Sequence, residues 1–327
     1  MENQIISFNT MGIMACQQNR YPMLFIDQVT ECLPGKYAKG YKLFSYNEWY
    51  FHGYETLNPK VWNVIQIEAM SQMFLMTFLS LDDMRGRVAM SNKFDNVNFI
   101  RKISPGDRLN LEANLISFGR GVARGEVKGY VDNILSCSMD CTIIVPDLFI
   151  NRLASNVEKV SLNNENISDK WEVKVDFGID KIRKCLLNKY PWLFIDKVLD
   201  IEPGKYVKAI KNFTYNEHYF PAHFPDDSSV PGFIQIETCM QAFLLTFLSL
   251  DSFKRLETAD RSLKNVSVKR KIVPGECLQI FATLDSLVRG IARGKVESFV
   301  DGEPAISFEI TAVILDEFNK FIPNVNK

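Results

Sequence analysis

Histidine is scarce in this chain, and the sequence lacks the spacings by which cysteines and histidines usually bind metals. The 327 residues include three histidines and seven cysteines, with no Cys-x-x-Cys and no His-x-x-x-His pair. Structural zinc sites commonly rely on closely spaced ligands of this kind. We therefore expect no metal site and no bound cofactor. The odd number and wide scatter of the cysteines indicate free thiols in a reducing compartment.

Basic excess and long apolar runs are absent too. Lys and Arg number 38 against 39 Asp and Glu, so the formal net charge is −1 and nucleic-acid binding is not expected. The longest apolar stretches, such as residues 243–248, fall short of the ~20 residues that a bilayer-spanning helix needs. The first residues show no basic segment followed by an apolar one, so no secretory signal is predicted. These features predict a cytoplasmic globular protein.

What the sequence does contain is a repeat. Segment 21–81 aligns with segment 190–250 at an offset of 169 residues (190 − 21), without a gap, and about half of the positions are identical. The match continues downstream, for example from Ala123-Arg124-Gly125 to Ala292-Arg293-Gly294. Solenoid repeats are ~20–50 residues long, so units of roughly 140–150 residues indicate a duplicated domain. We predict domains at residues 1–149 and 178–327, joined by a polar, Asn-rich linker at 150–177.

Both copies predict the same order of elements. In the second copy a short amphipathic helix is expected from Ile179 to Asn188. A long apolar helix, at 64–81 or 233–250, is hydrophobic on most faces and should be buried. Strands are expected in the second copy at 193–199, 206–213, 265–272, 277–288, 290–300 and 305–315. A buried helix wrapped by an antiparallel sheet, present twice, is an α+β fold.

The two copies diverge in one window. Residues 52–60 share no identity with residues 221–229, although both flanks match well. Either a surface loop has drifted, or the two copies do different work there, because loops both vary and carry function. The second copy has His223 in this window, where the first copy has Tyr54.

The second window resembles the active-site motif of the bacterial 3-hydroxyacyl-acyl-carrier-protein dehydratases. That motif is His-Phe-Pro-Gly, four variable positions, Pro-Gly and, five residues on, an acid. The chain has His223-Phe224-Pro225-Asp226, then Pro231-Gly232 and Glu237. The resemblance covers nearly the whole of each copy, and it departs from the motif at Asp226, which replaces a glycine.

The resemblance implies a double hotdog fold and a site built from both copies, with the histidine from one and the acid from the other. On this chain the catalytic pair is then His223 and Glu68, and the substrate-binding residues are Phe224, Pro231 and Gly232. The implied reaction removes water from a 3-hydroxyacyl thioester held on the phosphopantetheine arm of acyl carrier protein, as in fatty acid biosynthesis.

The residue types suit this chemistry. Histidine is a natural base for an α-proton because its pKa lies near neutrality. A carboxyl group in an apolar tunnel has a raised pKa and can donate a proton to the leaving hydroxyl. Pro231 and Gly232 begin the buried helix, whose exposed N–H groups can stabilise the thioester oxygen. Glu68, rather than Asp, argues against a second, isomerising activity in this family.

The mirror position would pair Tyr54 with Glu237, and Asn63 stands where the other site has Gly232. Tyrosine is a poor base at neutral pH because its pKa is about 10. We therefore predict that the mirror site is inactive.

Each candidate has a structural alternative. Glu68 and Glu237 could serve only as buried hydrogen-bond partners, because a buried acid is costly without one. Gln72 and Gln241, one helical turn on, either orient the acid or satisfy a polar spot. His52 is expected to be a loop residue, and His218, which matches Trp49, a packing or surface residue.

Basic residues near the Pro-Gly turns are candidates for docking the acidic carrier protein. They are Arg101, Lys102, Lys269, Arg270 and Lys271. A solvated strand face is the alternative.

Arg124 and Arg293 could serve strand pairing or contacts within a trimer. Because the hotdog pair is built into one chain, a monomer or a homotrimer is expected.

Two other functions remain open at this point. The chain could be a non-catalytic subunit that binds acyl thioesters, because Asp226 and the degenerate first copy depart from the motif. It could also be a hotdog thioesterase or a polyketide-type dehydratase, since a fold alone does not separate these activities.

Overall fold

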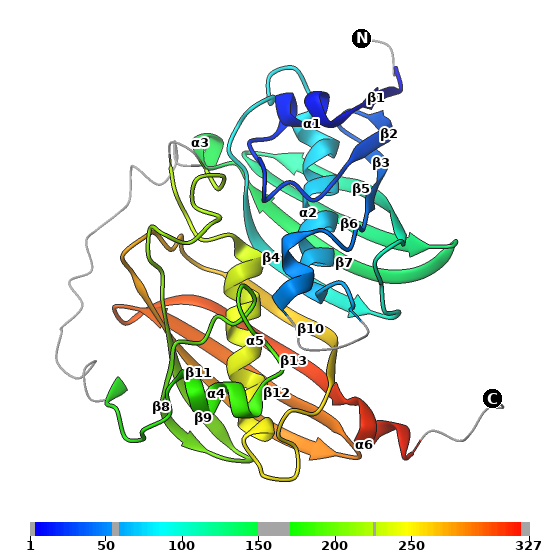
Figure 1. Cartoon of the computed structure of the whole chain (residues 1–327). Helices are drawn as coiled ribbons and strands as arrows, with labels where there is room; N and C mark the ends of the chain where they lie inside the picture. Colours follow the sequence, from blue (N-terminus) through cyan, green and yellow to red (C-terminus); the bar gives the residue numbers. More distant parts are fainter. Residues whose placement is uncertain (1–3, 54–58, 150–170, 225–226, 322–327) are drawn as a thin grey trace. The chain divides into compact units, whose positions relative to one another are not determined.

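The computed structural model describes residues 4–53, 59–149, 171–224 and 227–321. It divides into two compact units (Figure 1). The first comprises Met1–Glu48, Lys60–Glu165 and Tyr215–Phe233, and the second comprises Trp49–Pro59, Asn166–Thr214 and Ile234–Lys327. Each unit is therefore completed by a short segment that belongs to the other sequence repeat.

In the first repeat, antiparallel strands form a sheet in the order β1-β2-β3-β5-β6-β7-β4. Helix α2 packs against this sheet, chiefly on β3, β5 and β6. The elements are β1 (Ile6–Phe8), α1 (Thr10–Cys16), β2 (Gln28–Leu33), β3 (Tyr37–Leu43), η1 (Trp49–Gly53), α2 (Asn63–Leu79), β4 (Met90–Phe99), β5 (Arg108–Gly119), β6 (Val122–Val131), β7 (Ile134–Ile144) and α3 (Pro146–Phe149).

The second repeat has the same plan, with sheet order β10-β13-β12-β11-β9-β8. Its elements are α4 (Ile179–Cys185), β8 (Lys197–Glu202), β9 (Tyr206–Asn212), α5 (Gly232–Leu248), β10 (Thr258–Val268), β11 (Cys277–Val288), β12 (Ile291–Val300), β13 (Glu303–Ile314) and α6 (Leu315–Asn319). The predicted α+β fold, with one long buried helix per repeat, is confirmed.

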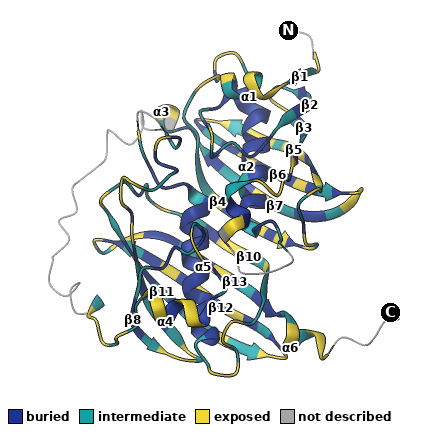
Figure 2. Ribbon diagram, in the orientation of Figure 1, coloured by how far each residue is buried: buried dark blue, intermediate teal, exposed yellow. Residues whose placement is uncertain are grey.

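The long helices α2 and α5 are buried over most of their length (Figure 2). Glycines in the Ala-Arg-Gly triplets let each helix pack closely against a strand of its own sheet. A Cβ atom at Gly125 would lie 2.3 Å from the Phe74 ring, and one at Gly294 would lie 2.5 Å from the Phe243 ring. The repeated triplet thus has a packing function that rests on its glycine, while Arg124 and Arg293 are exposed.

The predicted long helices agree with the structure to within two residues, but two strand predictions were wrong in position. The strand expected at 265–272 is Thr258–Val268, because Asn265 has φ 54° and the pairing with β13 shifts between Lys264 and Ser267. Such a bulge breaks the alternation that a pattern search follows. The strand expected from residue 193 begins at Lys197, because the Phe194 N–H bonds to the Gln241 side chain instead of a neighbouring strand.

Part of the predicted linker associates with the second repeat. The N–H of Lys174 donates to the carbonyl of Leu199 over 2.7 Å, and Phe177 forms a bridge with Val198. The rest of the predicted linker, residues 150–170, lies outside the described residues. In the described part of the chain, no helix combines the length and hydropathy that a membrane crossing requires.

Candidate active site

The loop that carries His223 fixes the protonation pattern of the imidazole. The ring Nδ1 lies 3.0 Å from the carbonyl oxygen of Ser229 and 3.3 Å from its hydroxyl. A carbonyl oxygen can only accept, so Nδ1 carries the hydrogen, and the lone pair of the neutral ring is on Nε2. The ring also stacks on Phe224, with centroids 4.3 Å apart. His223 is therefore held in the tautomer that a base at Nε2 requires.

Glu68 lies on α2 in an environment that favours the protonated carboxyl. Protein atoms surround the side chain closely, although it retains some accessible surface. Burial raises its pKa to about 7, and the hydrogen bond from Gln72 opposes part of that rise. A carboxyl group with this pKa is partly protonated at neutral pH, so it can donate a proton.

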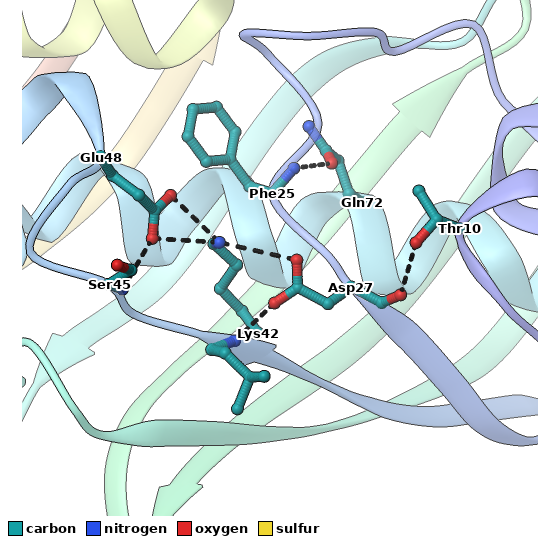
Figure 3. Close-up of polar contacts among 8 residues, drawn as sticks. Thr10, Phe25, Asp27, Lys42, Ser45, Glu48 and Gln72 are labelled. Atoms are coloured by element: carbon teal, nitrogen blue, oxygen red, sulfur yellow. Dashed lines mark hydrogen bonds and ion pairs between the residues drawn. The ribbon is translucent and has the colours of Figure 1, made fainter.

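Gln72 orients this carboxyl. Its oxygen accepts the N–H of Phe25 over 2.7 Å (Figure 3), which leaves the amide nitrogen to donate to the carbonyl of Met23 and to Glu68 Oε1, over 2.7 and 2.8 Å. Because Oε1 accepts this bond, the proton of neutral Glu68 resides on Oε2. Of the two alternatives for Gln72, the orienting contact is therefore present.

Gly232 is the first residue of α5, where an N–H group has no intrahelical acceptor. A Cβ atom at Gly232 would approach only Ser91 Cβ, at 3.9 Å, so packing in the described structure does not demand a glycine here. The next residue, Phe233, makes an edge contact with Phe25 at 5.5 Å between centroids. Phe25 thus contacts both Gln72, through its N–H, and the start of α5, through its ring. The hydrogen bonds by which Gln72 holds Glu68 and this backbone segment are called the Gln72 clamp below, and those of Gln241 the Gln241 clamp.

The histidine, the acid and the helix start belong to one compact unit. Glu68 lies in the part Lys60–Glu165, and His223, Phe224, Pro231 and Gly232 lie in the part Tyr215–Phe233. Phe224 and Pro231 are buried, and His223 is partly buried. The unit therefore combines the acid of the first repeat with the histidine segment of the second. Pro225 and Asp226 lie outside the described residues.

Two partly exposed carboxylates pair with the buried Lys42 at the point where the chain leaves the first unit. The Lys42 ammonium lies 3.1 Å from a Glu48 carboxylate oxygen and 3.6 Å from Asp27 (Figure 3). Asp27 also accepts the N–H of Leu43, and Glu48 accepts the N–H of Ser45. Glu48 is the last residue of the first unit before the exchanged segment begins at Trp49. These ion pairs and hydrogen bonds hold the backbone in place just before the exchanged segment.

At the mirror position, Tyr54 lies outside the described residues, so its predicted role stays a prediction. Gln241 repeats the clamp: it donates to Glu237 and to the carbonyl of Trp192, each over 2.9 Å. Asn63 begins α2, and its side-chain oxygen accepts a hydrogen bond from Gln66 over 3.1 Å. Glu237 is buried, with 4% of its surface exposed.

The other sequence candidates have varied surroundings. His52 is exposed on η1, and His218 packs edge-on against Tyr219, where burial lowers its pKa. Arg101 donates to the carbonyl of Val131 and pairs with Asp132.

Arg270 is engaged even more fully than Arg101. It donates to the carbonyls of Val300 and Lys271 and pairs with Glu276 and Glu303. Both arginines therefore brace neighbouring turns. Lys102 and Lys269 are exposed, and Lys271 is partly exposed.

Two supporting residues escaped the sequence reasoning. Ser229 sets the His223 tautomer through its backbone carbonyl, which no side-chain pattern reveals. Phe25 contacts both Gln72 and Phe233, and it lies in the repeated segment 21–81, which gives it no predicted role of its own. The one feature of the sequence that could have pointed to Phe25 is that the equivalent residue of the second repeat, Phe194, is also a phenylalanine.

Comparisons with known proteins agree with this architecture. The FabA-like domain model matches residues 18–139 and 186–309. The 3-hydroxyacyl-[acyl-carrier-protein] dehydratase FabZ of Clostridium novyi is 36% identical over 133 residues, which cover 41% of this chain and 94% of that protein.

Among solved structures, the dehydratase domain from the CurJ module of curacin polyketide synthase aligns with a TM-score of 0.57 and 12% identity, covering 90% of this chain and 98% of that one. A variant of the PpsC dehydratase domain from Mycobacterium tuberculosis aligns with a TM-score of 0.56 and 10% identity, covering 89% and 98%. These two likenesses concern the fold, which is a double hotdog.

Proposed function

Because the chain belongs to the FabA-like family of hotdog dehydratases, we propose that it removes water from a 3-hydroxyacyl thioester carried by acyl carrier protein. The product would be the trans-2-enoyl thioester. One working site would serve the whole chain, with His223 as the base and Glu68 as the acid.

The role of His223 is supported by its fixed tautomer. With the hydrogen on Nδ1, the lone pair on Nε2 can take the α-proton of the substrate. The protonated ring that results is stabilised by the Ser229 carbonyl, which continues to accept the Nδ1 hydrogen.

The role of Glu68 is supported by its raised pKa of about 7. Its Oε2 hydrogen passes to the β-hydroxyl group, which departs as water while the C2–C3 double bond forms. His223 has then gained one proton and Glu68 has lost one. A proton transfer from the imidazolium back to the carboxylate, through water, restores both groups.

Negative charge develops on the thioester oxygen as the α-proton leaves. The N–H of Gly232, at the positive end of α5, can donate to this oxygen. A glycine also lets the substrate approach the backbone closely.

The proposal is carried by one observation: a single compact unit unites Glu68 of the first repeat with the His223 segment of the second. For the carrier protein, the basic residues near the Pro-Gly turns stay the docking candidates, and among them Lys102 and Lys269 are exposed and Lys271 is partly exposed. An acidic carrier would be attracted to such lysines.

The test follows the reverse reaction, hydration of a crotonyl group on carrier protein, by loss of the enoyl absorbance. We expect near-complete loss of activity in His223→Ala and Glu68→Gln, and substantial activity in the matched control Glu237→Gln. Circular dichroism establishes that each variant is folded.

Two outcomes would count against the proposal. If Glu237→Gln is inactive while Glu68→Gln retains activity, the assignment across the repeats is wrong. If the native chain releases free carrier thiol without hydrating the crotonyl group, it is a thioesterase instead.

A further inference from the structure

The second unit contains an aromatic cluster that is linked to the mirror carboxyl through Gln241. Trp49 and Trp192 lie with ring centroids 5.2 Å apart, and Trp192 also contacts Tyr50 and Phe194, at 6.4 and 5.4 Å. Trp192 is fully buried. Its carbonyl accepts a hydrogen bond from Gln241, which also donates to Glu237. The cluster is therefore tied to the same clamp that holds the mirror acid.

The first unit has smaller side chains at the same repeat positions. Met23 is equivalent to Trp192, and His218 is equivalent to Trp49, at the offset of 169 residues. Both Met23 and His218 belong to the first unit, as both tryptophans belong to the second. The second unit thus carries two indole rings at the repeat positions where the first unit has a thioether and an imidazole.

The two acids differ in access accordingly. Glu68 keeps part of its surface accessible, whereas Glu237 is 4% exposed. Their Gln clamps are the same to within 0.1 Å for the bond to the acid, 2.8 against 2.9 Å. The difference in access therefore does not arise from the clamp.

We infer that Trp49 and Trp192 close the acyl-binding position beside Glu237, so that the chain holds one acyl group at a time, beside Glu68. This inference deepens the proposed function and rests on it for the identity of the ligand. It adds that the mirror site is inactive because its space is filled, and that a histidine at position 54 alone would not restore it. A packed aromatic cluster also stabilises the half of the molecule that no longer turns over substrate.

A chemical probe of carboxyl access tests the closure without relying on activity. A water-soluble carbodiimide adds to a protonated carboxyl group, and the adduct rearranges to a stable N-acylurea without another reactant. Mass spectrometry of the full-length chain, labelled at mildly acidic pH, reports the extent of modification at each glutamate. We expect Glu68 to be labelled several-fold faster than Glu237.

Substitutions between the repeats provide matched variants. Trp192→Met and Trp49→His give the second unit the side chains of the first, and each should raise the labelling of Glu237 several-fold. Met23→Trp makes the opposite change and should lower the labelling of Glu68. Equal labelling of both glutamates in the native chain would overturn the inference, as would an unlabelled Glu237 in folded Trp192→Met and Trp49→His chains.

The crotonyl hydration assay separates this inference from the proposed function. If Glu68 is labelled faster than Glu237 but the chain does not hydrate the crotonyl group, the inference that the tryptophans close the mirror position stands and the proposed dehydratase function is wrong. If the chain hydrates the crotonyl group but labels both glutamates equally, the proposed function stands and the closure is wrong.

Discussion

At the scale of single residues, the same amino acid acquires different properties in the two repeats. Glu68 and Glu237 have the same preceding residues, Gln-Ile, and each accepts a hydrogen bond from a glutamine one turn on. Their exposure differs, because Glu68 is partly exposed whereas Glu237 is 4% exposed. The shared preceding residues and the shared glutamine contact therefore do not determine how accessible each carboxyl is.

The raised pKa of Glu68 makes a prediction for stability. The folded-state pKa of about 7 exceeds the reference value of 4.5, so folding favours the protonated form. This contribution is fully present below pH 4.5 and is lost as the pH rises towards 7 and beyond. We expect Glu68→Gln to gain stability relative to the native chain by on the order of 2 kcal/mol at pH 8, after allowance for partial exposure.

Urea unfolding of both chains at acidic and mildly alkaline pH measures this difference. The comparison cancels the effect of pH on the other groups, because only Glu68 differs between the chains. A stability difference that does not change with pH would show that Glu68 ionises in the folded chain as it does in the unfolded one.

Gly232 offers a second prediction at this scale. Among the described residues, an alanine there meets only Ser91 Cβ, at 3.9 Å, so the free energy of unfolding should change by less than about 1 kcal/mol. Hydration activity should fall at least about tenfold, because the methyl group occupies the approach to the N–H that receives the thioester oxygen. Asn63→Ala, at the equivalent position in the first repeat, is the control and should keep its activity. Full activity in Gly232→Ala would contradict the proposal that the N–H of residue 232 stabilises the thioester oxygen.

At the scale of elements, a glutamine on each long helix bonds to the backbone of the segment that follows Tyr21-Pro22 in the first repeat or Tyr190-Pro191 in the second. Gln72 joins α2 to Met23 and Phe25, and Gln241 joins α5 to Trp192 and Phe194. Both glutamines are fully buried. A buried backbone donor or acceptor that loses its partner costs about 1–3 kcal/mol.

Methionine at either position removes the clamp while keeping the volume, so Gln72→Met and Gln241→Met should be destabilised by similar amounts, about 2–4 kcal/mol. Only Gln72→Met should lose kcat, because only Glu68 is the proposed acid. In the hydration direction Glu68 acts as the base that takes a proton from water, so the lower limb of the pH–rate profile, which reports the carboxylate, should also move. Equal losses of kcat in the two variants, measured by crotonyl hydration well below the unfolding temperature, would give Gln72 a purely structural role.

The elements themselves were largely predictable from local pattern. Continuous apolar runs predict α2 and α5, and the turns Pro274-Gly275 and Asp301-Gly302 separate some of the strands. The prediction failed where the backbone departs from alternation without a turn residue of obvious type, as at Asn265 in β10. A bulge depends on pairing with another strand, which local sequence does not encode.

The candidate site was predictable only in part. The repeat offset and the family motif pointed to His223, Gly232 and Glu68. The Trp49–Trp192 contact was beyond reach, because it joins residues 143 positions apart (192 − 49) in different repeats. In the sequence, Trp49 stands out only as the counterpart of His218, and Trp192 is one of the unmatched positions in the repeated segment 190–250.

At the scale of the whole molecule, the exchange of segments explains why a duplicated chain can specialise. The first unit borrows Tyr215–Phe233, and the second borrows Trp49–Pro59. In a pair of identical domains, both borrowed segments would have one sequence and both sites would be equal. Fusion lets residues 52–60 and 221–229 diverge, so the second copy has His223 where the first has Tyr54. It also lets Trp49 and Trp192, whose rings are in contact, differ from their counterparts His218 and Met23.

The exchange also predicts how the chain responds to a cut. A specific protease site inserted near residue 160, within the predicted linker, separates the two repeats covalently. Each compact unit still contains parts of both fragments, such as Phe25 of one in contact with Phe233 of the other. Because these contacts bury apolar side chains, separation would expose them to water. The fragments should therefore co-elute in size-exclusion chromatography and retain hydration activity, whereas dissociation without denaturant would mean that the linker, and not the exchanged segments, holds the site together.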